Sequence, residues 1–185
     1  MAHTVLYLPV PGLEPYIRWR HEVEGPEWLS PEVDHTHAHV TVLGPFVPEP
    51  ELTPQVHADL AAVFADTEPF TFTLEEVRVF PSGLVYLHPE PSELFMRLTD
   101  AVTARFPDHP PYAGEFAAVP HLSLCALVPG RDLDVVRTEL ACVLPVQTVA
   151  EEVWLVRYEE HGTRRLRRYP LGQGLAGGSA GVLTG

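Results

Sequence analysis

Two short segments of the chain share one pattern, a histidine followed two residues later by a small hydroxyl residue. The first segment is His39-Val40-Thr41-Val42 and the second is His121-Leu122-Ser123-Leu124. Side chains alternate between the two faces of a β-strand, so each histidine and its hydroxyl residue point to one face, about 7 Å apart, and the apolar residues point to the other. The copies lie 82 residues apart (121 − 39). The repeat therefore predicts two similar halves that each present an imidazole and a hydroxyl group to a shared cleft.

Two histidines across a cleft can carry out acid–base catalysis. The unperturbed pKa of histidine is about 6.5, so one imidazole can remove a proton from a nucleophile while the other protonates the leaving oxygen. Each such transfer contributes roughly 10²–10⁴ in rate. A phosphodiester suits this arrangement, because in-line displacement places the attacking and leaving oxygens on opposite sides of phosphorus. The hydroxyl groups of Thr41 and Ser123 can donate hydrogen bonds to the non-bridging oxygens. We therefore predict His39, Thr41, His121 and Ser123 as the catalytic residues.

The same residues also allow other interpretations. His35, His37 and His39 alternate along one predicted strand and could be metal ligands. Asp34 is the single carboxylate whose position supports such a site, so we expect no metal and no cofactor. A single histidine is by default a structural residue, and Thr41 is of a type that favours strands in any case. The repetition of the whole pattern favours a catalytic pair.

The flanks of the two motifs resemble the two-histidine (2H) phosphoesterase superfamily, in particular its bacterial branch labelled 2′-5′ RNA ligase-like. Residues 38–46 read AHVTVLGPF, residues 110–116 read PPYAGEF and residues 119–124 read VPHLSL. The similarity extends over about residues 3–172 and closes with RYPLG at 168–172. It implies an α+β fold in which two pseudo-symmetric lobes of antiparallel sheet, with flanking helices, surround a central cleft. It also implies His39 and His121 as acid–base partners.

The resemblance further implies a hydrolase that acts on 2′,3′-cyclic phosphates or 2′-5′ phosphodiesters of small nucleotides or RNA ends. We accordingly expect a metal-independent phosphodiesterase. The alternatives are a non-catalytic nucleotide-binding module of the same fold and a 2′-5′ RNA ligase. Some members of the superfamily carry an arginine two positions past the second motif, where this chain has Ala126. An arginine that binds phosphate would then come from Arg157 or from the cluster at 164–168.

Four aromatic residues are candidates for stacking on a base, which is the usual way to hold a single-stranded nucleotide. They are Phe46, Phe80, Tyr86 and Tyr112, and each of them could instead pack in the core or in a loop. Tyr112 stands out because its proline-rich loop directly precedes His121. The predicted substrate-binding residues are Tyr112, Phe46 and Arg157.

Hydrophobic periodicity and turn signals predict the elements that position these residues. Strands are expected at 3–8, 36–43, 70–80, 84–88, 121–127, 149–158 and 164–170. Helices are expected across 13–21, from Thr53-Pro54 onward, from near Ser92 to about 106, and from Asp132 to about 143. The order strand, helix, motif strand, helix occurs twice. We predict one bilobal domain over 1–171 and a glycine-rich, disordered tail over 172–185.

Composition restricts the partners of the chain. Its 185 residues have a formal net charge of −13 and contain no lysine, which argues against binding to long nucleic acid through the phosphate backbone. No stretch approaches the roughly 18 consecutive apolar residues that span a bilayer. The two cysteines, Cys125 and Cys142, lie in apolar surroundings and are expected to be buried thiols, as in the cytoplasm. We expect a cytoplasmic monomer without membrane contact, whose partner is a small nucleotide or RNA-end substrate.

Overall fold

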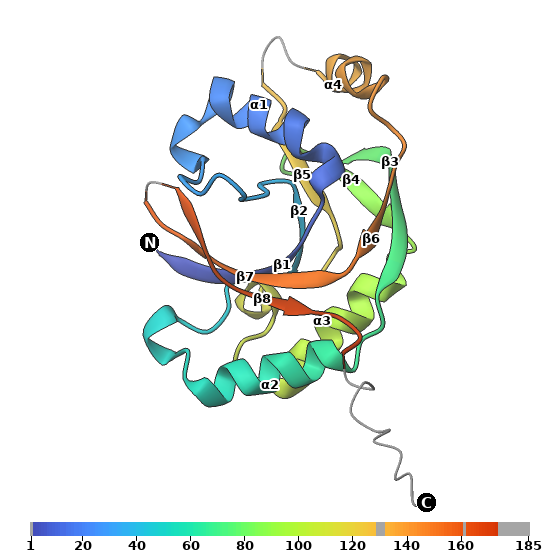
Figure 1. Cartoon of the computed structure of the whole chain (residues 1–185). Helices are drawn as coiled ribbons and strands as arrows, with labels where there is room; N and C mark the ends of the chain where they lie inside the picture. The colour runs from blue at the N-terminus through green and yellow to red at the C-terminus, as the bar shows by residue number, and fades with distance from the viewer. Residues whose placement is uncertain (1, 129–131, 161, 174–185) are drawn as a thin grey trace, which may run out of the picture.

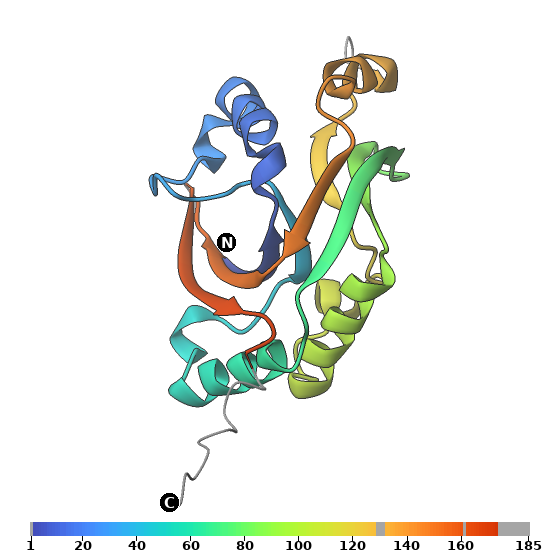
Figure 2. The ribbon, with the colours of Figure 1, turned by 45° about the vertical axis from the view of Figure 1, so that its right-hand side comes forward.

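Two four-stranded antiparallel sheets form the framework of the protein (Figure 1). The computed structural model describes residues 2–128, 132–160 and 162–173. The first sheet has the order β2-β1-β7-β8 and curls into a half-barrel (Figure 2). Its strands are β1 (His3–Pro9), β2 (His39–Leu43), β7 (Glu152–Tyr158) and β8 (Thr163–Pro170). The second sheet has the order β5-β4-β3-β6. Its strands are β3 (Phe70–Val79), β4 (Leu84–Glu90), β5 (Leu122–Ala126) and β6 (Val146–Ala150).

The described ranges contain four α-helices, which are α1 (Glu14–Glu24), α2 (Pro54–Ala65), α3 (Glu93–Arg105) and α4 (Leu133–Leu140). Two helices begin at the caps that the sequence predicts. The Thr53 hydroxyl accepts a hydrogen bond from the Val56 amide, and the Asp132 carboxylate accepts from the amides of Asp134 and Val135. Within the described part of the chain, no helix is both long and apolar enough to cross a bilayer.

The two halves of the chain repeat one arrangement. Strand, helix, motif strand and helix follow one another as β1-α1-β2-α2 and again as β4-α3-β5-α4. In both sheets the motif strand lies at an edge and pairs with the first strand of its own half. The predicted α+β fold with two related lobes of antiparallel sheet is confirmed.

Several local predictions need correction. The strand predicted at 149–158 is two strands in different sheets, because the chain crosses from β6 to β7 at Glu151. The predicted strand at 36–43 begins only at His39, since the amides of His37 and Ala38 donate to the Glu14 carboxylate instead of to a strand. The two cysteines are thiols rather than a disulfide, and Cys125 is buried as predicted, but Cys142 is exposed. Residues 174–185 of the predicted tail lie outside the described residues.

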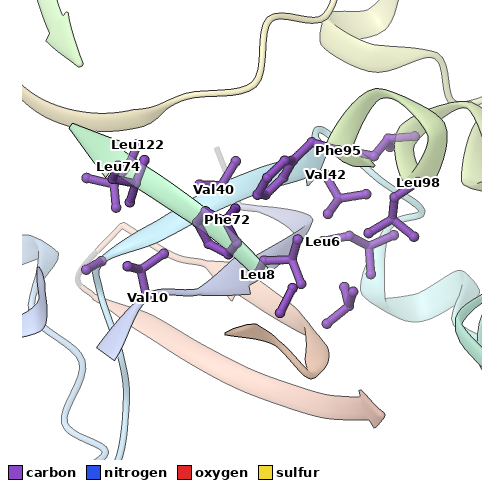
Figure 3. Close-up of a cluster of buried hydrophobic side chains, with 14 of the residues drawn as sticks. Leu6, Leu8, Val10, Val40, Val42, Phe72, Leu74, Phe95, Leu98 and Leu122 are labelled. Atoms are coloured by element: carbon purple, nitrogen blue, oxygen red, sulfur yellow. The ribbon is translucent and has the colours of Figure 1, made fainter. Parts of the chain in front are cut away.

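The apolar residues of both motifs anchor their strands in one core. Val40 and Val42 of β2 and Leu122 of β5 are almost fully buried, and they lie among side chains from β1, β3 and α3 (Figure 3). At about 25 cal/mol per Å² of apolar surface, burial of each such side chain stabilises the fold by roughly 1.5–3 kcal/mol. Because side chains alternate along a strand, this core turns the histidine and hydroxyl residue of each motif to the opposite face.

Candidate active site

The imidazole of His39 is held on three sides. Its Nδ1 lies 2.6 Å from the carbonyl oxygen of His37. Its ring stacks on the buried ring of Tyr7, with 4.2 Å between centroids and 25° between planes. Since a carbonyl oxygen only accepts hydrogen bonds, Nδ1 carries the proton and Nε2 of the neutral ring has a free lone pair. The hydroxyl of Tyr158 lies 3.4 Å from this Nε2 and can donate to it.

The second motif repeats this geometry. Nδ1 of His121 lies 2.7 Å from the carbonyl oxygen of Val119, again two residues earlier in the chain. The ring meets two aromatic side chains edge to face, Phe80 at 5.0 Å and Tyr86 at 5.7 Å between centroids. Nε2 of His121 is therefore the nitrogen that remains available for proton transfer, as in His39.

Burial favours the neutral form of both histidines. Burial, with smaller effects from the imidazoles of His35 and His121, lowers the pKa of His39 to about 4, against the opposing effect of the hydrogen bond to the His37 carbonyl. Burial also lowers the pKa of His121, and the Val119 carbonyl opposes this shift. At neutral pH the pair therefore offers proton-accepting nitrogens rather than two positive charges.

The two motif strands meet at the edges of their sheets, where β2 contacts β5. A small pocket joins them and is lined by Thr41 and Gly44 on one side and by Val119 and Pro120 on the other. Thr41 pairs with Tyr7, whose ring stacks on His39. Ser123 is exposed and pairs with Tyr86, whose ring contacts His121. All four predicted catalytic residues thus lie on, or directly before, the two strands that meet here, and of the four Thr41 lines the pocket.

The predicted substrate-binding residues lie in three different places. Tyr112 lines the pocket beside Thr41, and its amide donates to the Gly44 carbonyl at 2.9 Å. Its backbone is left-handed, with φ 51° and ψ 33°, which is a strained conformation for a tyrosine. Phe46 belongs to the core instead, since it is 3% exposed and packs against Phe106. It is therefore not accessible to a base.

Arg157 also needs correction. It precedes Tyr158 in β7, so its side chain leaves the sheet on the face opposite the hydroxyl group that contacts His39. Its guanidinium pairs there with Glu49 and Glu159. Arg157 is thus directed away from the two histidines.

Two other arginines of the predicted basic cluster lie on the face of the first sheet that carries Tyr7 and His39. The guanidinium carbons of Arg165 and Arg168 lie 4.5 and 4.8 Å from the ring centroid of Trp154, which is itself 5.9 Å from that of Tyr7. Both arginines donate to Oδ2 of Asp34, at 2.8 and 2.9 Å. Arg165 and Arg168 therefore lie on the same face of the sheet as the candidate site.

The alternating histidines before β2 do not converge on one point. His35 Nε2 lies 3.2 Å from the Tyr7 hydroxyl and 3.1 Å from that of Thr163. His37 Nδ1 lies 2.7 Å from the Glu14 carboxylate, and His37 Nε2 accepts from the Ser30 amide. The rings of His35 and His37, whose centroids are 4.8 Å apart, thus have different hydrogen-bond partners. In residues 2–128, 132–160 and 162–173, no group of three or more histidine, cysteine, aspartate or glutamate side chains is arranged to hold a metal ion.

Comparison with known proteins adds a family and a set of similar folds. The family model of the 2′-5′ RNA ligase superfamily matches residues 9–162. Among solved structures, LigT from E. coli, complexed with 3′-AMP, is 17% identical, with a TM-score of 0.52 over 93% of this chain and 99% of that one. TT0787 from Thermus thermophilus is 19% identical, with a TM-score of 0.62 over 92% and 98%. A phosphoesterase is 18% identical, with a TM-score of 0.57 over 92% and 98%. A search of curated proteins finds no match.

Proposed function

The chain belongs to the 2′-5′ RNA ligase superfamily, whose members include phosphoesterases, and on this premise we propose that it is a phosphodiesterase with two catalytic histidines. Its substrate is a 2′,3′-cyclic phosphate or a 2′-5′ phosphodiester of a small nucleotide or RNA end. The observation that carries this proposal is the matched state of the two imidazoles. His39 and His121 each donate Nδ1–H to the carbonyl two residues earlier and keep Nε2 for proton transfer.

In the proposed reaction, the two histidines have different roles. His39, with its pKa of about 4, is neutral at pH 7 and accepts a proton from the attacking water at Nε2. The water oxygen bonds to phosphorus as the bond to the leaving ribose oxygen breaks. His121 donates a proton from Nε2 to that leaving oxygen, and the negative charge of the bound phosphate favours the imidazolium form that this requires. Thr41 and Ser123 donate hydrogen bonds to the non-bridging oxygens.

Two observations support a small substrate: the net charge of this chain and the ligands of a structurally similar protein. The net charge of −13 opposes binding of a long polyanion. LigT from E. coli has been crystallised with 3′-AMP, ATP and NADP⁺, all of them nucleotides. Tyr112, which lines the pocket beside Thr41, is the residue that we propose to contact the base.

We expect kcat/KM to rise as the pH falls below neutrality, because more of the proposed acid His121 is then protonated, and to fall again only as the pH approaches the pKa of His39, about 4. The pKa of this base is lowered, so the base is unprotonated above that pH and loses its function as pH falls through it. The measurement is kcat/KM against pH, with circular dichroism at each pH to separate this effect from unfolding. An acid limb near pH ~6.5, the ordinary pKa of histidine, with the fold intact, would contradict the proposed role of His39.

The proposed function is tested with a substrate panel in the presence of EDTA. The panel contains the four 2′,3′-cyclic nucleotides and short 2′-5′ oligonucleotides, and the position of the phosphate in each product is determined. We expect turnover of at least one substrate class, at the same rate with and without the chelator. Loss of activity that added metal ions restore would refute the metal-independent mechanism. Binding of the panel without turnover would instead favour a non-catalytic nucleotide-binding module, and joining of RNA ends would favour a ligase.

A further inference from the structure

Glu14, the first residue of α1, contacts the chain immediately before the first motif. Its Oε2 accepts hydrogen bonds from the amides of His37 at 2.6 Å and Ala38 at 2.9 Å. Its Oε1 lies 2.7 Å from Nδ1 of the His37 ring. The Glu14 side chain is only 19% exposed and that of His37 2% exposed. Three N–H groups therefore converge on one largely buried carboxylate.

The ionised state of Glu14 agrees with these contacts. Burial by itself would raise the pKa of Glu14, but hydrogen bonds from the His37 ring and the Ala38 amide lower it below its usual value. An ionised carboxylate only accepts hydrogen bonds, which matches three donors. Nε2 of His37 accepts from the Ser30 amide at 2.9 Å, so the ring of His37 is also fixed at its far side.

One peptide group connects Glu14 to His39. The amide of Ala38 and the carbonyl of His37 belong to the same peptide bond, which is planar and rigid. At one end of this plane the N–H donates to Glu14, and at the other end the carbonyl oxygen accepts from Nδ1 of His39 at 2.6 Å. The direction of the carbonyl, and with it the tautomer and orientation of the imidazole, therefore depends on the Glu14 carboxylate.

In the second motif, the carbonyl that accepts from the histidine Nδ1 is held in a different way. The peptide bond that corresponds to His37–Ala38 is Val119–Pro120, and its carbonyl accepts from Nδ1 of His121. Proline has no N–H, so no carboxylate can hold this plane in the same way, and the ring itself restricts the backbone. The requirement for a buried carboxylate is thus particular to the first half of the chain.

We propose that Glu14 is a positioning residue, which holds His39 in its Nδ1–H tautomer through the peptide bond between His37 and Ala38. The effect on turnover rests on the proposed phosphodiesterase function, whereas the effect on the ring of His39 does not. Loss of the carboxylate releases the peptide plane, so the ring of His39 populates the second tautomer and Nε2 is no longer free to accept a proton.

The test compares Glu14→Gln with Glu22→Gln, a matched control on the same helix whose carboxylate is exposed and pairs with Arg18. The tautomers of His39 and His121 are read from ring ¹⁵N chemical shifts, and kcat and KM are measured on the best substrate of the panel. For Glu14→Gln we expect a mixture of tautomers at His39 and an unchanged His121. We expect kcat to fall roughly 10- to 100-fold with little change in KM, as for a misplaced catalytic group. Glu22→Gln should match the wild type in every measurement.

A folded Glu14→Gln variant that keeps His39 in the wild-type tautomer would overturn the proposal. If this variant does not fold, Glu14→Asp tests the proposal by the same NMR measurement. Aspartate keeps the negative charge, but its side chain is one methylene shorter, so the carboxylate is displaced from the three N–H groups. The second tautomer at His39 is then expected, and a wild-type tautomer would refute the proposal. A wild-type protein without turnover would contradict the proposed function alone, since the NMR measurement needs no substrate.

Discussion

Replacement of either His39 or His121 with alanine is expected to reduce kcat by roughly 10²–10⁴, because each variant loses one of the two proton transfers. The fold should survive, since both side chains project from the face opposite the core that Val40 and Leu122 anchor. The measurement is steady-state hydrolysis of a 2′,3′-cyclic nucleotide, together with thermal unfolding of each variant.

His57→Ala provides the matched control. His57 lies on α2, where its Nδ1 is 2.6 Å from the Tyr169 hydroxyl, remote from the β2–β5 junction. This variant should retain wild-type kcat even if its stability falls. Near-wild-type turnover in His39→Ala or His121→Ala would show that the corresponding imidazole is not an acid–base group.

The second large effect is expected at the hydroxyl groups. Thr41→Val keeps the shape and the β-branched side chain that suits a strand, but it removes a donor to the phosphate oxygens. Loss of one such donor typically lowers kcat by about 10²–10³, and we expect a loss of this size for Thr41→Val and for Ser123→Ala. Kinetics on the same cyclic nucleotide provide the measurement.

Conservative variants separate this role from a structural one. Thr41→Ser restores the hydroxyl without the methyl group and should recover most of the lost rate. Thr71→Val makes the same substitution at an exposed position of β3 and should leave kcat unchanged. Wild-type kcat/KM in Thr41→Val, or no recovery in Thr41→Ser, would argue against phosphate contact by this hydroxyl.

Most of the secondary structure can be predicted from local sequence patterns. The alternation of apolar residues around His39 and His121 predicts both motif strands, and the caps at Thr53 and Asp132 predict two helix starts that the structure contains. These features depend on interactions within a few residues, so they can be inferred from the sequence. The repeated order of elements also predicts the two related lobes.

Features that depend on long-range pairing could not be inferred in this way. Residues 149–158 read VAEEVWLVRY, without a glycine, a proline or another turn residue, and only the pairing partners of β6 and β7 reveal that this segment crosses between sheets. Arg157 and Tyr158 are neighbours in the chain, yet the register with β1 directs only Tyr158 toward His39.

Glu14 was missed for a related reason. It is a single carboxylate on a helix that otherwise carries solvent-exposed acidic residues, and nothing local marks it as the buried one. Its role depends on α1 packing beside the segment before β2, where three N–H groups reach it.

The most direct test of the central claim is a double-mutant cycle on the two histidines. Groups that act together in one reaction step show non-additive losses, because removal of the first already disables the step. We predict that the double variant His39→Ala/His121→Ala hydrolyses a 2′,3′-cyclic nucleotide at the same residual rate as either single variant. Losses that multiply in the double variant would contradict the claim that the two imidazoles form one acid–base pair.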